Sequence, residues 1–203
     1  MFKPLRLKAD NLSCERGGRL VFRDISFDIN AGELAELRGA NGAGKSSLLR
    51  LVAGLNSTSS GALTLEGGEA EGTIAEHCHY IGHAEANKPA LTVRENIEFW
   101  RAFLGGAKTP NAYSAFGLEE LADDQTLLLS SGQKRRLALT RLVIAYRPIW
   151  LLDEPTVGLD TASTQTLQNQ MHKHLKTGGI VIAATHTELG LKATKNIQLG
   201  KSA

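Results

Sequence analysis

The chain has 203 residues, of which 42% are hydrophobic, so it is long enough to bury a core and too apolar for a disordered segment. Its 23 basic and 21 acidic residues leave a net charge of +2, which argues against the basic surface of a nucleic-acid-binding protein. Apolar runs are too short to span a bilayer and the N-terminus does not resemble a signal peptide, so we expect a cytosolic protein.

The N-terminal third predicts a β-rich layer followed by a strand, a loop and a helix. Residues 5–12 and 20–29 alternate apolar and polar side chains, which predicts two half-buried strands joined by a turn at Gly17-Gly18. Residues 33–38 predict a short strand that leads into a glycine-rich loop, and residues 45–53 predict the helix after that loop.

The middle of the chain predicts two strands and then two helices. Residues 62–65 and 77–82 are the predicted strands, on either side of an acidic loop. Residues 92–104 and 112–121 have apolar side chains at helical spacing. We interpret residues 84–128 as an inserted helical lobe.

The C-terminal part alternates helices and strands. We predict a helix over 131–146, a strand over 149–153, a helix over 161–174 and a strand over 180–185. This order predicts one α/β domain over residues 1–203, with a mainly parallel core sheet covered on both faces and an antiparallel N-terminal β layer. Residues 1–83 and 129–203 would form the catalytic core and the β layer.

A phosphate-binding loop lies between a predicted strand and a predicted helix. It reads Gly39, Ala40, Asn41, Gly42, Ala43, Gly44, Lys45 and Ser46. Its glycines let backbone N–H groups converge on phosphate oxygens at a helix N-terminus, where the helix dipole favours negative charge. We expect Lys45 to reach the β- and γ-phosphates of ATP and the Ser46 hydroxyl to help hold Mg²⁺. The alternative, a chance glycine turn, does not explain the complete pattern.

The apolar strand over residues 149–153 delivers a carboxylate at its C-terminal end, where α/β sheets bind ligands. Asp153 is the expected second anchor for Mg²⁺. Glu154 is placed to act as the general base on the attacking water. The alternative is a solvated turn residue before Pro155, which the upstream phosphate loop disfavours.

These residues resemble those of the ATP-binding subunits of ABC transporters, and the resemblance covers essentially the whole chain. Residues 129–133 are similar to the signature motif of that family, residues 158–160 to its D-loop, and His186 to its switch histidine. In the family, two such subunits sandwich two ATP molecules, and each signature motif completes the site held by the phosphate loop of the other subunit. The resemblance therefore implies a homodimer in the ATP-bound state.

The resemblance also implies roles for individual residues. Asp160 would link the two sites and His186 would hold the γ-phosphate, although a histidine that merely ends a buried strand is the alternative for His186. A segment that opens a helix offers free N–H groups to an anion. The signature residues expected to bind nucleotide across the dimer are Ser130, Ser131, Gly132 and Gln133.

Four positions depart from the family pattern. Ser131 replaces the usual first glycine of the signature, which keeps a small side chain but reduces backbone freedom. Ser47 stands in the phosphate-binding segment where threonine is common. His83 replaces the glutamine that senses the γ-phosphate and Mg²⁺ and contacts the membrane partner; a neutral imidazole offers a nitrogen to a bridging water. Arg16 is the best candidate to stack on adenine, where many members have an aromatic residue.

The run His77, Cys78 and His79, with His83 nearby, suggests a metal or haem site as an alternative. Strand alternation places His77 and His79 on one face and Cys78 on the other, so they do not converge without a turn. We therefore interpret them as strand residues beside a nucleotide loop. Cys14 and Cys78 lie in unrelated contexts and are expected to be reduced thiols.

One branch of the family is most similar in residues 14–16, His83 and Ser131: the ATP-binding subunit of the bacterial haem exporter used in cytochrome c maturation. This implies integral membrane subunits as partners, a peripheral position at the cytoplasmic face of the inner membrane, and a role in haem export or release of the haem chaperone. The alternatives are the ATPase of another small-molecule ABC transporter, a soluble ABC ATPase acting on ribosomes or DNA, and a small-molecule kinase. The printed residues hold one cassette without a long coiled-coil insertion, which disfavours the soluble class, and a kinase leaves residues 129–133 unexplained.

Overall fold

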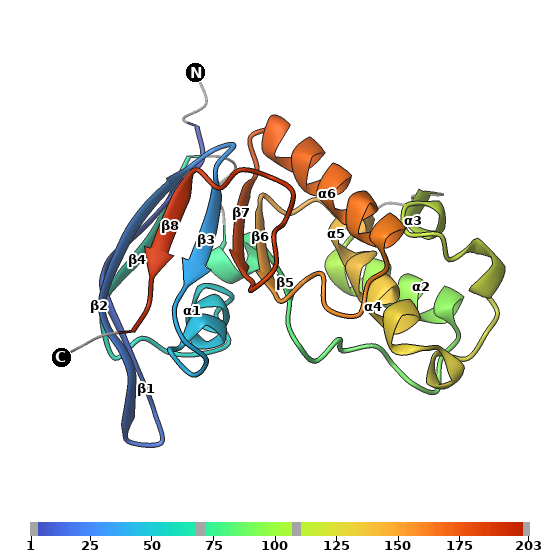
Figure 1. Ribbon diagram of the computed structural model, residues 1–203, viewed down its shortest axis with the longest axis horizontal. Helices are drawn as coiled ribbons and strands as arrows, with labels where there is room; N and C mark the ends of the chain where they lie inside the picture. The colour runs from blue at the N-terminus through green and yellow to red at the C-terminus, as the bar shows by residue number, and fades with distance from the viewer. Residues whose placement is uncertain (1–3, 68–71, 107–110, 201–203) are drawn as a thin grey trace.

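The computed structural model describes residues 4–67, 72–106 and 111–200. Figure 1 shows an antiparallel sheet, a parallel sheet beside it, and a group of helices on the far side of the parallel sheet. Helix α1 (Lys45–Val52) lies between the two sheets. One buried apolar cluster fills the space around α1, and a second lies between the parallel sheet and the helices.

The antiparallel sheet has the order β2 (Arg19–Asn30), β1 (Arg6–Arg16), β4 (Ser60–Glu66). Strands β1 and β2 form the predicted hairpin. Gly17 and Gly18 make its turn with φ angles of +55° and +73°. Two consecutive left-handed residues suit the right-handed twist of a tight hairpin, and glycine adopts them without steric cost.

The parallel sheet has the order β5 (Cys78–Ile81), β6 (Ile149–Asp153), β7 (Ile180–Ala184), β3 (Leu34–Arg38), β8 (Lys195–Gln198). Every neighbouring pair is parallel, as predicted. Strands β6 and β7 are buried along their whole length, which explains their unbroken apolar sequences. The prediction that the strand of β5 begins at His77 was wrong, because His77 ends the 3₁₀ helix η1 (Ile74–His77).

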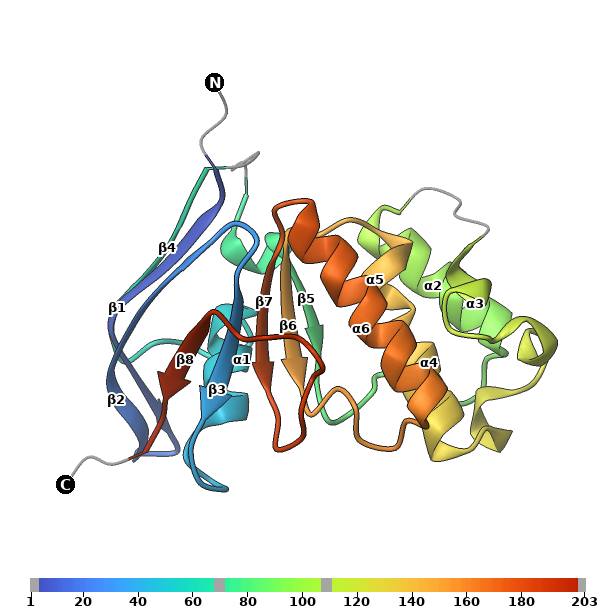
Figure 2. The same cartoon turned by 45° about the horizontal axis from the view of Figure 1, so that its top comes forward.

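The helices of the second layer are α2 (Val93–Leu104), α3 (Asn111–Ser114), α4 (Ser131–Leu139), α5 (Arg141–Ile144) and α6 (Thr161–Lys176), with 3₁₀ turns η2 (Glu119–Leu121) and η3 (Thr126–Leu128). Figures 1 and 2 both place α6 between the parallel sheet and helices α2 and α3. Within the described ranges, no helix is long and apolar enough to cross a membrane.

Two predicted helices are interrupted. The helix predicted over 112–121 breaks because Gly117 takes a left-handed conformation (φ +61°), which leaves α3 and η2 as separate turns. The helix predicted over 131–146 is divided at Thr140, whose hydroxyl donates to the Leu137 carbonyl (2.7 Å). Its second part ends at Ile144, since Ala145 is already extended.

Candidate functional site

A cleft of about 590 Å³ opens at the carboxyl ends of the parallel strands, where α/β sheets bind ligands. The structure brings together here residues from five separate segments of the sequence. The lining residues are Val21, Asn41, Gly42, Gly44, Lys45, Ser46, Ser47, His83, Asp153, Glu154, Val157, His186 and Thr187.

The phosphate loop follows a path that only glycine permits at two points. A Cβ atom at Gly39 would lie 2.2 Å from the Leu199 carbonyl oxygen, and one at Gly44 would lie 3.0 Å from Cγ1 of Val21. Gly44 begins α1 with φ +99° and provides no side-chain cap. The N–H groups of the first turn of α1 therefore have no capping side chain, and they suit a phosphate better than a neutral ligand.

Lys45 and Asp153 are charged side chains in largely buried positions at the cleft. Lys45 is 9% exposed, and its Nζ donates to the carbonyl oxygens of Gly39 (2.8 Å) and Ala40 (3.2 Å). Asp153 is 5% exposed at the end of β6. Ser46 lines the same cleft, so a carboxylate and a hydroxyl lie near the phosphate loop. Oxygen donors of this kind fit Mg²⁺.

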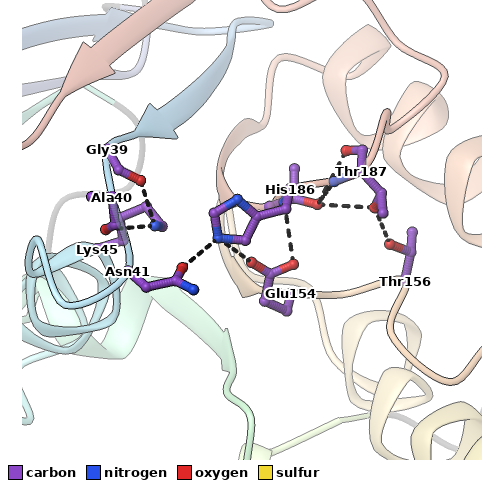
Figure 3. A network of polar contacts seen from close by, with 9 residues as sticks. Gly39, Ala40, Asn41, Lys45, Glu154, Thr156, His186 and Thr187 are labelled. Carbon is purple, nitrogen blue, oxygen red and sulfur yellow. Dashed lines mark hydrogen bonds and ion pairs between the residues drawn. The ribbon is translucent and has the colours of Figure 1, made fainter.

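Glu154 and His186 both line the cleft, and their side chains lie next to each other (Figure 3). The Glu154 carboxylate accepts a hydrogen bond from the His186 backbone N–H (3.3 Å), and it lies 3.6 Å from Nε2 of the ring. The same Nε2 is 2.9 Å from Oδ1 of Asn41. The imidazole therefore bridges the phosphate loop and the end of β6, two segments that lie far apart in the sequence.

Three lining residues were missed by the sequence interpretation: Val21, Val157 and Thr187. Thr187 supports the loop after β7, because its hydroxyl is 2.7 Å from that of Thr156 (Figure 3) and 3.1 Å from that of Thr185. None of the three belongs to a recognisable motif. Val21 is one of several alternating apolar residues of β2, so its pattern predicts a strand and not a site.

The signature segment caps helix α4 and does not line the cleft of its own chain. Ser130 Oγ accepts from the Gln133 N–H (3.2 Å), and Gln133 Oε1 accepts from the Ser130 N–H (2.7 Å). A Cβ at Gly132 would lie 2.7 Å from the Gly158 carbonyl oxygen, so glycine is required for close contact with the D-loop segment. Ser131 is helical and exposed.

Asp160 and Arg16 also lie outside the lining of this cleft. Asp160 begins α6 and accepts from the Ser163 N–H (2.7 Å), a hydrogen bond that lowers the pKa of its carboxyl. Arg16 is exposed at the end of β1, opposite Arg19 in the hairpin. Val21, from the returning strand, is the hairpin residue that lines the cleft.

His79 and Cys78 of β5 contact different parts of the chain. His79 Nε2 lies 2.7 Å from the Ala145 carbonyl oxygen, and burial lowers the pKa of His79 to about 4. Cys78 Sγ lies 3.2 Å from the Ile74 carbonyl oxygen, and burial raises its pKa to about 12. Among the described residues, no three His, Cys, Asp or Glu side chains are grouped to hold a metal ion. Cys14 and Cys78 are both free thiols.

Comparison with known proteins matches residues 22–157 to the family described as ABC transporter. A protein of Rhodopseudomonas palustris (strain BisB5) named "Cytochrome c biogenesis ATP-binding export protein CcmA" is 48% identical, over 97% of this chain and 99% of that protein. A protein of the same name from Nitrobacter winogradskyi is 47% identical, over 98% of this chain and 100% of that protein.

Two solved structures share the fold at low sequence identity. The ATP-binding subunit of an ABC transporter has a TM-score of 0.85 at 23% identity, covering 95% of this chain and 85% of that one. An ATP-binding cassette solved as a dimer in a post-hydrolysis state with ADP and Pi has a TM-score of 0.80 at 22% identity, covering 95% and 94%. The predicted P-loop fold of ABC type is confirmed, and the chain belongs to the ABC transporter family as an ABC-type ATPase.

Proposed function

We propose that this chain is the ATP-hydrolysing subunit of an exporter that serves cytochrome c maturation, in haem export or in release of the haem chaperone. The observation that carries the ATPase part is the cleft in which the phosphate loop, Asp153, Glu154 and His186 meet. The cytochrome c part is supported by the names of the two relatives at 47% and 48% identity, which mention cytochrome c biogenesis and export. No residue of the cleft distinguishes haem from another cargo.

We assign each step of hydrolysis to a residue of the cleft or its loop. The loop amides and Lys45 would bind the phosphates of ATP, while Ser46 and Asp153, with His83 through a water, would hold the Mg²⁺ that neutralises their charge. Glu154 would accept the proton of the attacking water. His186 would contact the γ-phosphate through Nε2, the ring nitrogen that lies beside Oδ1 of Asn41.

The ATP-bound state would be a homodimer. Ser130, Gly132 and Asp160 lie outside the cleft of their own chain, yet the first-turn amides of α4 are suited to an anion. A second copy with its phosphate loop facing α4 would give these amides a γ-phosphate to bind. ATP would then hold together two surfaces that neither chain completes alone.

Integral membrane subunits would dock beside His83, on the helical lobe that we assign to residues 84–128. A groove of about 250 Å³ lies there; Leu127, which lines it, and the neighbouring Leu128 have exposed fractions of 63% and 78%. The residues lining the groove are Glu85, Ala86, Asn87, Pro89, Thr126, Leu127 and Lys134. Asn87 Oδ1 is buried without a hydrogen-bond partner among the described residues. This docking would place the chain peripherally at the cytoplasmic face of the inner membrane.

Deletion of the gene tests the proposal. We expect loss of holo-c-type cytochromes with b-type cytochromes retained, measured on haem-stained gels and by difference spectra of membranes. Complementation with the wild-type gene should restore the c-type signal, whereas a Glu154→Gln gene should not. Normal c-type cytochromes in the deletion strain would reject the haem-export role and favour an ABC transporter for another small molecule.

A further inference from the structure

Arg135 of helix α4 is a buried cation whose partners are carbonyl oxygens. It is 4% exposed and forms no ion pair with any residue in the described part of the chain. Its guanidinium donates to the carbonyl oxygens of Gly82 (2.8 Å), Asp153 (2.9 Å), Glu154 (2.7 Å) and Pro155 (3.3 Å). Burial of an unpaired charge is unfavourable unless its donors are satisfied, and these four oxygens accept from four of the five N–H groups.

The four carbonyls lie at the ends of β5 and β6, where two loops of the proposed site begin. The Gly82 carbonyl belongs to the loop that leaves β5 and leads directly to His83. The other three belong to the segment that leaves β6 with the proposed Mg²⁺ ligand and general base. Arg135 itself lies on α4, the helix that Ser130 caps, so one side chain joins the signature helix to both loops.

The backbone of Glu154 needs such support. Its φ of +47° lies in the left-handed region, which a residue with a Cβ occupies only when its surroundings hold it there. Its N–H donates to the Ala184 carbonyl (2.8 Å), and its carbonyl accepts from Arg135. Both sides of the residue are therefore held, and this conformation directs the carboxylate towards His186.

We infer that Arg135 is a positioning residue for hydrolysis: through the carbonyls of Asp153 and Glu154, it holds the general base in its working conformation and ties that conformation to the signature helix. The inference rests on the proposed role of Glu154. A lysine at this position keeps the charge, but it replaces a planar fork of five N–H donors by one ammonium group on a flexible stem. It cannot hold four carbonyls in two loops at the same time.

The test compares Arg135→Lys with the matched control Arg136→Lys in the purified full chain. Arg136 is the neighbouring arginine on α4, and it donates to the carbonyls of Phe116 and Gly117, away from the base. For Arg135→Lys we expect the Kd for a fluorescent ATP analogue to stay within about threefold and kcat to fall by about ten- to a hundredfold, within the range expected for impaired general-base catalysis. The control should keep both values. In a Glu154→Gln background, Arg135→Lys should cause no further loss of turnover, because the base it positions is already absent.

If Glu154→Gln is inactive, as expected for loss of the general base, either of two results would overturn the inference. One is a wild-type kcat in Arg135→Lys. The other is a parallel loss of ATP affinity, turnover and Tm in Arg135→Lys, which would mean that the arginine only stabilises the fold. If Glu154→Gln itself hydrolyses ATP at the wild-type rate, the base assignment fails and the positioning role fails with it, so the two failures are observed in different variants.

Discussion

Replacing Glu154 by glutamine should separate ATP binding from hydrolysis. Glutamine keeps an oxygen for the His186 N–H, and His186 Nε2 keeps its contact with Asn41, so the local structure should persist. In the proposed mechanism, binding depends on Lys45 and the loop amides, which the substitution does not touch. Loss of a general base lowers the rate by about 10²- to 10⁴-fold, or about 3–5 kcal/mol in activation free energy. We therefore expect unchanged or tighter ATP binding without significant turnover.

The assay measures phosphate release and, by size-exclusion chromatography with Mg²⁺ and ATP, the fraction of dimer. Glu154→Gln should accumulate as an ATP-bound dimer, whereas the wild-type chain returns to monomer as ATP is consumed. Glu188→Gln is the matched control, because Glu188 is an exposed carboxylate two residues beyond His186 and does not line the cleft. Phosphate release from Glu154→Gln at the rate of this control would refute the assignment of the base.

Three further predictions concern the nucleotide, the membrane partner and pH. His83→Ala should keep ATP affinity within a few-fold but lower the ATPase rate stimulated by the co-expressed membrane subunit, and His83→Gln should recover much of it; an unchanged stimulated rate in His83→Ala would make this histidine an ordinary loop residue. Val21→Asp should weaken ATP binding about tenfold or more, because Val21 lines the cleft, whereas Arg16→Ala should weaken it by less than threefold; the reverse order, measured by equilibrium binding, would assign adenine stacking to Arg16. Burial lowers the pKa of His79 and of His174 to about 4, from the ordinary 6.5. At a pH between these two values, the unfolded chain therefore binds protons at both histidines, and the folded chain does not. Each histidine should therefore lower the free energy of unfolding by about 1.4 kcal/mol per pH unit as pH falls through this window. Urea titrations at several pH values should show a smaller loss in His79→Gln, and an equal loss would contradict the assignment.

The local elements of this fold follow from the sequence because the forces that define them are local. Alternation over residues 20–29 and the glycine pair at 17–18 predict the hairpin, and the apolar run at 149–153 predicts a strand covered on both faces. Two predicted helices were wrong in extent, because a single residue interrupts each of them: Gly117 in the first and Thr140 in the second. Strand β8 was not predicted, because its four residues are mostly polar and it is an edge strand with one buried side chain.

The candidate site was predictable where a motif exists and not where a contact is made across the fold. The phosphate loop is one continuous run of residues, and Asp153 and Glu154 are adjacent at the end of an apolar strand, so each has a recognisable local pattern. The contact between Asn41 and His186 joins residues 145 positions apart, and the contacts of Arg135 with two loops depend on how α4 packs against β5 and β6. No periodicity in the sequence contains such information, since it arises only when the helices cover the sheet.

Ser131 can replace the usual signature glycine because the groups that α4 leaves without a hydrogen-bond partner are backbone N–H groups. The side chains of Ser130 and Gln133 cap each other's backbone, and the Gln133 N–H is engaged by Ser130 Oγ. The N–H groups of Ser131 and Gly132, the first two of the helix, have no intrahelical partner. A γ-phosphate presented by a second copy would therefore be bound by backbone donors, which serine provides as well as glycine does. Gly132 is different, because any side chain there would collide with the Gly158 carbonyl, so we expect the segment to tolerate change at Ser131 and not at Gly132.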